Sequence, residues 1–497
     1  MGDKVCLEAF DYKGKYYIPC KENEYNRVTY WNKSQYNEIR KIYAPKDPTE
    51  KELARFNEDW PDFNTLWKID LTQEEIDRNG NIRGGCYRIV FKSKEPEYIS
   101  KDSDKNNNNI NMKKVTDTIY YIGCDDADIR LFESQYNVPE GMCYNSFLIM
   151  DEKVAIMDTS DKRTMEEWKK NLTEGLDGRK PDYLVVQHLE PDHASGIAEV
   201  KAMYPEIKIV CSAKAKTMIP LFFPELNVDD CVIAVKEGDT LELGKHTLHF
   251  VMAPMVHWPE VMVTYDALDK VLFAADGFGK FGVMDADPDD WACEARRYYF
   301  NICGKYGGPV STLLKKASQL DINMILPLHG PFLSGEKMQE ALRLYTIWSS
   351  YGVEAEGVLI AHASIHGCTK AAAEKLADIL RAKGCKKVAI TDLCRDDLAE
   401  AIEDAFKYGK VILAASSYDA GLFPPMFDFL HHLKIKAWQK REVSVFWVNG
   451  SCLALTTILL RWLMVISSSE QKMKQSSELI LRVMRNFAFT YSSISWL

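Results

Sequence analysis

Apolar and polar positions follow three different patterns along the chain. Between about residues 112 and 350, short apolar runs are separated by turn residues and by occasional helical segments. Short strands at this spacing predict two packed sheets with helices outside them. The expected strands lie at residues 146–150, 183–186, 207–210, 247–252, 261–264, 271–275 and 324–328.

A different rhythm begins at about residue 354, where strands and helices alternate. Alternation of this kind is typical of a doubly wound parallel sheet, which binds its ligands at the carboxyl ends of the strands. The expected strands lie at residues 358–361, 388–391, 411–415 and 443–447, and the expected helices at 370–382 and 398–406.

The first 110 or so residues are rich in Tyr, Lys, Glu and Asn and contain no group of residues that indicates chemistry. They end in a polar, Asn-rich run at residues 101–109, which is typical of a linker. We therefore expect an N-terminal extension of unknown function at residues 1–111, a sandwich domain at 112–353 and a doubly wound domain at 354–497.

Composition limits the setting in which the protein works. The acidic excess, 72 Asp and Glu against 62 Lys and Arg, argues against a nucleic-acid-binding protein. The N-terminus has no apolar signal segment, so the 13 cysteines are expected to be reduced thiols in a cytoplasmic protein. The apolar run at residues 452–466 contains Arg461 and is shorter than the ~20 residues of a membrane span, so no membrane association is expected.

Two histidines and two carboxylates follow the strand expected at residues 183–186. They are His188, Glu190, Asp192 and His193. In an extended segment, alternate residues project to the same side, so we expect His188, Glu190 and Asp192 to converge. Burying such polar groups in a loop costs free energy unless they are paired. A bound cation is the simplest partner that would offset this cost. The alternative is a solvated acidic turn that happens to contain histidines.

Three later strands in the same region also lead into good metal ligands. These are His257, Asp276 and His329, each of which follows an apolar run. Ligands from several strand ends meet at one edge of a sandwich. We therefore expect one metal centre formed by six residues: His188, Glu190, Asp192, His257, Asp276 and His329. Nitrogen and oxygen ligands without a thiolate favour a pair of first-row metals such as iron or manganese over structural zinc.

The combination of these motifs resembles the flavodiiron proteins, also called A-type flavoproteins, from about Met112 to about Glu442. The motifs are His188-x-Glu190-x-Asp192-His193, Pro254-x-x-His257-Trp-Pro259, Ala275-Asp-Gly-Phe-Gly279, Pro327-x-His329-Gly-Pro331 and Glu140-Gly-Met-Cys-Tyr-Asn-Ser-Phe-Leu148. The resemblance implies an α/β protein, in which a metallo-β-lactamase-like αββα sandwich is followed by a flavodoxin-like doubly wound parallel sheet. It also implies FMN and two non-haem iron ions as cofactors.

The resemblance further implies a role for each ligand. His188, Glu190 and His257 would bind one iron, Asp192 and His329 would bind the other, and Asp276 would bridge them. His193 matches a position whose histidine turns away from iron in some members of the family.

Two loops in the last part of the chain are candidates for FMN binding. Hydroxyls and backbone N–H groups at a helix N-terminus form a phosphate site, although Ser and Thr also serve as ordinary helix caps. The first loop resembles the phosphate loop of flavodoxins and contains Ser364, Ile365, His366, Gly367, Cys368 and Thr369. The second resembles the loop that holds the flavin ring and contains Ser416, Ser417, Tyr418 and Asp419. A third loop, at residues 447–452, and the apolar tail after it depart from the family pattern.

Together these features predict an oxidoreductase that passes electrons from FMN to a diiron centre. Reduced flavin and a ferrous pair each supply two electrons, enough to reduce dioxygen to water, and the same centre would reduce nitric oxide to nitrous oxide. The resemblance implies a head-to-tail homodimer and an electron donor such as rubredoxin or a flavin reductase. Two alternatives stay open: a binuclear-metal hydrolase of the metallo-β-lactamase type, and an electron carrier with an inactive metal site.

Overall fold

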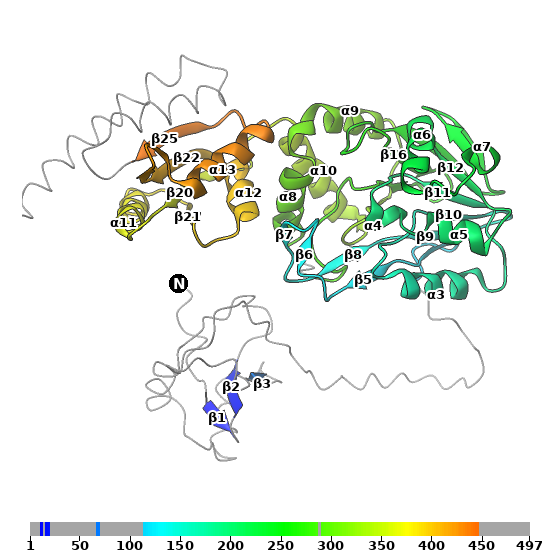
Figure 1. Cartoon of the computed structure of the whole chain (residues 1–497), viewed down its shortest axis with the longest axis horizontal. Coiled ribbons are helices and arrows are strands. Elements are labelled where there is room, and N and C mark those ends of the chain that lie inside the picture. The colour runs from blue at the N-terminus through cyan, green and yellow to red at the C-terminus, as the bar shows by residue number, and fades with distance from the viewer. Residues whose placement is uncertain (1–9, 13–14, 20–65, 70–112, 287–289, 447–497) are drawn as a thin grey trace, which may run out of the picture. The chain divides into compact units, whose positions relative to one another are not determined.

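The structure is a computed structural model that describes residues 10–12, 15–19, 66–69, 113–286 and 290–446. The chain divides into two compact units, Met1–Asn108 and Asn109–Leu497 (Figure 1). The described residues of the first unit form an antiparallel sheet of β1 (Phe10–Tyr12), β2 (Lys15–Pro19) and β3 (Leu66–Ile69). The predicted linker at 101–109 and the apolar tail lie outside the described residues.

Two six-stranded sheets form the first part of the second unit. The first has the order β13-β12-β11-β10-β9-β4 and is parallel from β10 to β13; the second has the order β14-β15-β16-β17-β18-β19. The strands of the first sheet are β4 (Ile119–Tyr121), β9 (Phe147–Met150), β10 (Val154–Met157), β11 (Tyr183–Val186), β12 (Lys208–Ser212) and β13 (Val232–Val235). Those of the second are β14 (Thr240–Glu242), β15 (Thr247–Met252), β16 (Met262–Asp266), β17 (Val271–Phe273), β18 (Met324–Leu326) and β19 (Leu333–Ser334).

Helices cover the outer faces of both sheets, as Figure 1 shows. Those in the first half of this part are α3 (Met165–Leu176), α4 (Pro191–Ala194), α5 (Ile197–Met203), α6 (Ala213–Phe222) and α7 (Val228–Cys231). Those in the second half are α8 (Trp291–Ile302), the 3-10 turn η1 (Gly304–Tyr306), α9 (Gly307–Ala317) and α10 (Gly335–Ser349). Two short hairpins lie beside the sandwich: β5 (Cys124–Asp126) with β8 (Met142–Tyr144), and β6 (Leu131–Phe132) with β7 (Tyr136–Asn137).

Strand alternation explains why the sheets are covered on both faces. In β11, Val185 joins Phe250 and Phe273 in the core between the two sheets, whereas Leu184 and Val186 pack in the core with α3. Successive strand residues point to opposite faces, so both faces of this strand are apolar and buried. The αββα sandwich predicted from the sequence is therefore confirmed.

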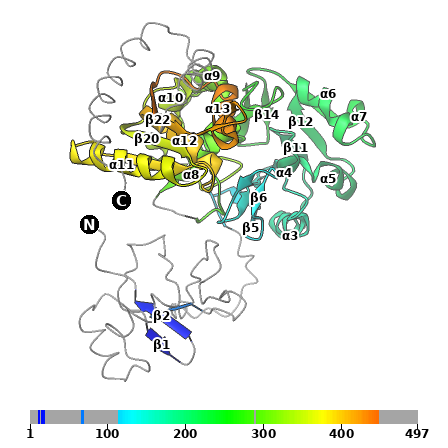
Figure 2. The same cartoon turned by 60° about the vertical axis from the view of Figure 1, so that its left-hand side comes forward.

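The last described part is a parallel sheet with the order β21-β20-β22-β25. Helix α11 packs on one face, where Ile360 meets Ala373, and α12 and α13 pack on the other, where Ala361 belongs to the core with Phe429 (Figure 2). The elements are β20 (Ala355–Ala363), α11 (Cys368–Ala382), β21 (Val388–Asp392), α12 (Leu398–Lys407), β22 (Tyr408–Ala415), β23 (Ser417–Tyr418), β24 (Gly421–Leu422), α13 (Pro424–Ile435) and β25 (Glu442–Phe446). This arrangement confirms the predicted flavodoxin-like fold.

Two strands are shorter than the sequence predicts, and the difference determines where the ligands lie. The strand expected at residues 271–275 ends at Phe273, and the one expected at 324–328 ends at Leu326. Gly277 N–H donates to the carbonyl of Ala274 at 2.9 Å and closes a turn directly after the first of these strands. Asp276 is therefore a turn residue rather than a strand end.

None of the helices in the described ranges has the length and apolar content that crossing a membrane requires.

A buried charge cluster joins the sandwich to the parallel sheet. Arg296 of α8 donates from Nε and Nη2 to the two carboxylate oxygens of Glu354, at 2.7 Å each, and from Nη1 to Glu403 of α12 at 3.1 Å. The rings of Phe300 and Phe406 stack beside it with centroids 4.1 Å apart. The stacked rings belong to the apolar core that the two parts share, and Arg296 and Glu403 are also buried.

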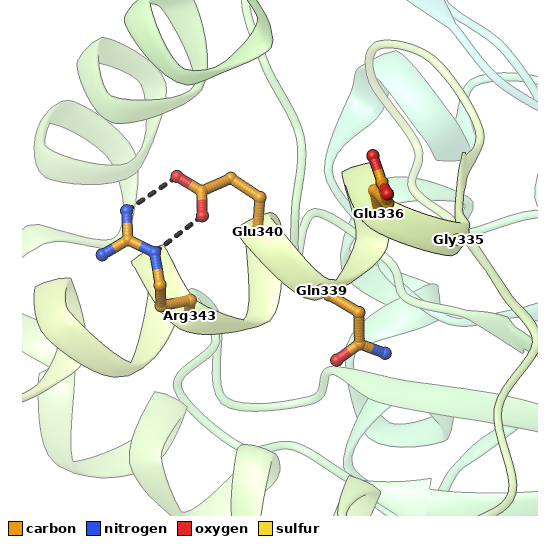
Figure 3. Close-up of a pocket in the computed structure, with 5 residues that line it drawn as sticks. All are labelled: Gly335, Glu336, Gln339, Glu340 and Arg343. Carbon is orange, nitrogen blue, oxygen red and sulfur yellow. Dashed lines mark hydrogen bonds and ion pairs between the residues drawn. The ribbon is translucent and has the colours of Figure 1, made fainter.

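Replacing Arg296 with Met is expected to lower the free energy of unfolding by about 3–5 kcal/mol, because two buried carboxylates lose their charged partner. The matched control is Arg343→Met. Arg343 forms a similar two-point pair with Glu340, but on the exposed face of α10 (Figure 3). Loss of such a surface pair costs about 0–1 kcal/mol. Urea unfolding of both variants tests the difference, and equal shifts in the two would contradict it.

Candidate metal centre

The loop after β11 begins as the sequence predicts and then departs from it. Gln187 donates from its backbone N and its side chain to the two oxygens of buried Asp158, at 2.7 and 2.8 Å, and holds the start of the loop. Glu190 is extended, with φ −61° and ψ 138°, but Pro191 begins the short helix α4. Proline favours the first position of a helix because its φ is fixed and it lacks an N–H. The prediction of an extended segment through Asp192 is therefore wrong beyond Glu190.

This change divides the candidate ligands into two groups. In each group the ligand atoms lie within 4.8 Å of one another. The first group is His188, Glu190, His257 and Asp276, and the second is Asp192, His193 and His329. Six of these seven side chains are buried, and Glu190 is partly exposed.

Within the first group, the imidazole of His257 approaches two carboxylates. Its Nε2 lies 3.0 Å from Glu190 Oε2 and 2.9 Å from Asp276 Oδ2. The Nε2 of His188 lies 3.1 Å from the same oxygen of Glu190. These nitrogen and oxygen atoms therefore converge on one small space.

Within the second group, two imidazoles face each other. The Nε2 atoms of His193 and His329 are 3.0 Å apart, and Asp192 Oδ2 lies 3.3 and 3.2 Å from them. His193 thus points into the group. The sequence did not determine whether its side chain points toward the other ligands or away from them. Its direction follows from its position on α4, one residue after Asp192.

Asp276 lies between the two groups. Its Oδ2 faces His257 at 2.9 Å and His188 at 3.4 Å, whereas its Oδ1 faces His193 at 3.2 Å and His329 at 3.9 Å. One carboxylate that offers one oxygen to each of two ligand groups has the arrangement of a bridging ligand.

The polar atoms of these groups fit bound metal ions. Both carboxylate oxygens of Asp192 and Oδ1 of Asp276 are buried without a hydrogen-bond partner among the described residues. A buried carboxylate oxygen without a hydrogen bond raises the free energy of the folded state, and a bound cation offsets this cost. The donors are imidazole and carboxylate throughout, the set that suits first-row divalent metals. The residues present therefore fit a pair of metal ions.

The electrostatics of the first group favour positive charge. Burial lowers the pKa of His257, but hydrogen bonds with Asp276 and Glu190 outweigh it and raise that pKa to about 9. Burial raises the pKa of Asp192 to about 7. The carboxylates of the first group thus attract a cation strongly enough to keep a buried imidazole charged.

Two hydrogen bonds fix histidines from outside the groups, and the sequence analysis missed both partners. Glu260 Oε1 lies 2.8 Å from Nδ1 of His188, and the carbonyl of Cys143 lies 2.7 Å from Nδ1 of His329. Glu260 follows His257 by three residues, so proximity to the Pro254–Pro259 motif was the available signal. The backbone carbonyl of Cys143 carries no sequence signal.

The two candidate flavin loops meet at the carboxyl ends of β20 and β22. Thr369 Oγ1 lies 3.2 Å from Ser416 Oγ, and Gly367 N–H donates to Ser364 Oγ at 3.1 Å. Gly367 caps α11 with φ +88°, a conformation that glycine adopts without strain. The helix begins at Cys368, two residues earlier than predicted, which places Thr369 in its first turn.

The exposed residues of these loops fit a phosphate and a flat ring. Residues 365–368 are exposed around the N-terminus of α11, where unpaired N–H groups favour an anion. Ile365 and Tyr418 expose 37% and 49% of their surface. Ser417 and Asp419 are exposed beside Tyr418. The third predicted flavin loop, at 447–452, lies outside the described residues.

A separate surface hollow lies on α10 and is lined by Gly335, Glu336, Gln339, Glu340 and Arg343 (Figure 3). It contains none of the predicted site residues. Two of its charged side chains, Glu340 and Arg343, pair with each other, and we assign the hollow no role.

Comparisons with known proteins agree with this geometry. Residues 142–330 match the family model described as "ODP family beta lactamase". The solved structure of rubredoxin:oxygen oxidoreductase from Desulfovibrio gigas is 26% identical, with a TM-score of 0.67, and the match covers 72% of this chain and 91% of that one. This chain is similar to flavodiiron proteins in sequence and in fold.

Two further proteins match over a similar length. The flavodiiron protein of Giardia intestinalis shares the fold, with a TM-score of 0.68 at 23% identity over 73% of this chain and 90% of that one. The anaerobic nitric oxide reductase flavorubredoxin of Escherichia coli is 28% identical over 362 residues, which are 69% of this chain and 74% of the relative.

Proposed function

We propose that this protein is a flavodiiron oxidoreductase that transfers electrons from FMN to a pair of non-haem irons and reduces dioxygen to water, nitric oxide to nitrous oxide, or both. The observation that carries the proposal is the position of Asp276, which offers one oxygen to each of two His/carboxylate groups. When bound, FMN and the iron pair supply the redox chemistry, while the protein supplies geometry and charge.

The side chains of the two groups would hold the irons. His188, Glu190 and His257 would bind one and Asp192, His193 and His329 the other, with Asp276 bridging them. The carboxylates of Glu190, Asp192 and Asp276 would offset most of the charge of two divalent ions. Burial of six of these seven side chains limits the access of water to the centre.

The FMN would lie across the two loops described above. Ser364, Gly367 and Thr369 would hold its phosphate at the N-terminus of α11, together with the exposed Ile365, His366 and Cys368. Ser416, Ser417, Tyr418 and Asp419 would hold the ring. This position matches the carboxyl ends of parallel strands, where doubly wound sheets bind ligands.

Thr369→Glu is expected to abolish FMN binding, because the new carboxylate would occupy the position proposed for the phosphate and repel it. The control is Thr369→Ser, which keeps the hydroxyl and should retain the flavin. Visible absorption of the purified variants measures FMN per chain. Stoichiometric FMN in Thr369→Glu would show that the phosphate lies elsewhere.

The proposed partners follow from the relatives. One is named a rubredoxin:oxygen oxidoreductase and another a flavorubredoxin. We propose rubredoxin or a flavin reductase as the electron donor, and a head-to-tail homodimer in the cytoplasm as the working form.

Metal analysis and gas consumption test the proposal together. Protein expressed with ample iron should contain about two irons and one FMN per chain, and after anaerobic reduction it should consume dioxygen or nitric oxide. Measuring both gases in parallel determines the preferred substrate. Zinc as the main metal, with hydrolysis of a β-lactam or thioester and no gas consumption, would instead support the binuclear hydrolase. Iron and FMN without gas consumption would support an electron carrier.

A further inference from the structure

Glu260 is a buried carboxylate that contacts a proposed metal ligand without belonging to either ligand group. Its side chain is fully buried, and its Oε1 lies 2.8 Å from His188 Nδ1. The same oxygen accepts a 3.0 Å hydrogen bond from the backbone N–H of Leu189. Its other oxygen, Oε2, has no hydrogen-bond partner among the described residues. The strongest polar contact of this carboxylate is therefore the imidazole of His188.

The ring of His188 connects Glu260 to the first ligand group. Its Nδ1 faces Glu260, whereas its Nε2 lies 3.1 Å from Glu190 Oε2 and 3.4 Å from Asp276 Oδ2. A proton on Nδ1, shared with Glu260, leaves the lone pair of Nε2 free for a metal. A carboxylate in this position also increases the electron density that the imidazole donates.

In the part of the chain that the structure describes, no carboxylate holds the second group in this way. The Nδ1 of His329 lies 2.7 Å from the carbonyl oxygen of Cys143, a neutral acceptor. The Nδ1 of His193 is buried without a hydrogen-bond partner among the described residues. The outer hydrogen bonds of the two groups therefore differ by one full negative charge.

We propose that Glu260 is a positioning residue that makes the two metal positions unequal. It fixes His188 with Nε2 unprotonated and strengthens it as a donor. The position formed by His188, Glu190 and His257 consequently binds metal more tightly and stabilises its higher oxidation state. The proposal rests on the proposed function only in requiring that both groups bind metal.

Glu260→Gln tests the effect of the negative charge separately from the effect of the side chain's shape. The amide has nearly the same size, and its oxygen keeps both hydrogen bonds, but the negative charge is lost. Glu260→Ala removes the hydrogen bonds as well. The matched control is Asp266→Asn: Asp266 Oδ1 lies 3.0 Å from Nδ1 of the buried His246, and these two residues form, with Asp269, a third His/carboxylate group that is separate from both proposed metal positions. This control measures the effect of removing a buried, histidine-bound carboxylate as such.

Anaerobic titration of the metal-free full chain with Co²⁺ gives the affinity of each position without any measurement of turnover. Glu260→Gln should weaken one position about 10–100-fold and leave the other unchanged, as is typical for loss of a partner of a metal-bound histidine. Glu260→Ala should weaken the same position further, and Asp266→Asn should leave both unchanged. In protein loaded with ⁵⁷Fe, Mössbauer spectra should show a change in one of the two iron signals.

The outcomes distinguish this inference from the proposed function. Two positions in the wild type, with the same affinities and the same iron signals in Glu260→Gln, would overturn the inference alone. Glu260→Gln decides the matter if Glu260→Ala does not fold, because the amide preserves the packing. A wild type that binds no metal pair would overturn the proposed function and this inference together.

Discussion

Asp276→Asn is expected to remove metal from both positions of the centre at once. Asp276 offers Oδ2 to the first ligand group and Oδ1 to the second, so loss of its charge weakens both. Because the residue would bind metal directly, the loss of affinity should exceed the ~100-fold upper range seen for indirect partners. Iron per chain, measured after purification and dialysis, should fall from about two to near zero, whereas FMN content should not change.

His329→Ala provides the contrast. His329 belongs to the second group only, and its Nε2 lies 3.2 Å from Asp192. This variant should keep the first metal and lose the second, giving about one iron per chain. If Asp276→Asn retains one iron, or His329→Ala loses both, then the assignment of Asp276 as the bridge is wrong. Unchanged FMN in both variants shows that the parallel-sheet domain is intact.

The sequence predicted that these His, Asp and Glu side chains lie close together, because they follow strands. His188, His257, Asp276 and His329 all lie in loops that follow strands, and the parallel pairing of β17 with β18 brings the loops of Asp276 and His329 to one edge. Apolar runs with turn residues after them are visible in the sequence. The fold and the approximate position of the site could therefore be predicted from the pattern alone.

The division of the ligands into two groups could not be predicted from alternation. Because Pro191 begins a helix, alternate residues project to the same side as far as Glu190, and this pattern no longer applies at Asp192. His193 then points to His329 because it lies on that helix. A single proline, with its fixed φ, changes which ligand group a carboxylate faces.

Contacts between segments that lie far apart in the sequence could not be predicted either. Glu260 meets His188 across 72 positions of the chain, and Arg296 meets Glu403 across 107. Both contacts depend on packing that no local pattern specifies. Buried charges of this kind are identified only when their partners are seen, because an isolated Glu or Arg in a sequence is usually an exposed residue.

Co-expression of two inactive variants is expected to restore activity. Asp276→Asn should keep FMN and lose iron, and Thr369→Glu should keep iron and lose FMN. In the proposed head-to-tail dimer, the FMN of one chain faces the irons of its partner. A heterodimer of the two variants would then contain one complete FMN–iron pair across the interface and one empty pair.

The expected activity follows from this geometry. A symmetric wild-type dimer has two productive pairs and the heterodimer has one, so the purified heterodimer should show about half the wild-type rate of dioxygen or nitric oxide consumption. Different affinity tags on the two variants allow the heterodimer to be isolated, and each variant alone serves as the background. If electrons instead pass within one chain, neither chain of the heterodimer is complete, and its rate must stay at that background. The half-rate therefore requires transfer between chains, because no other pairing in the heterodimer joins a bound FMN to a filled iron site.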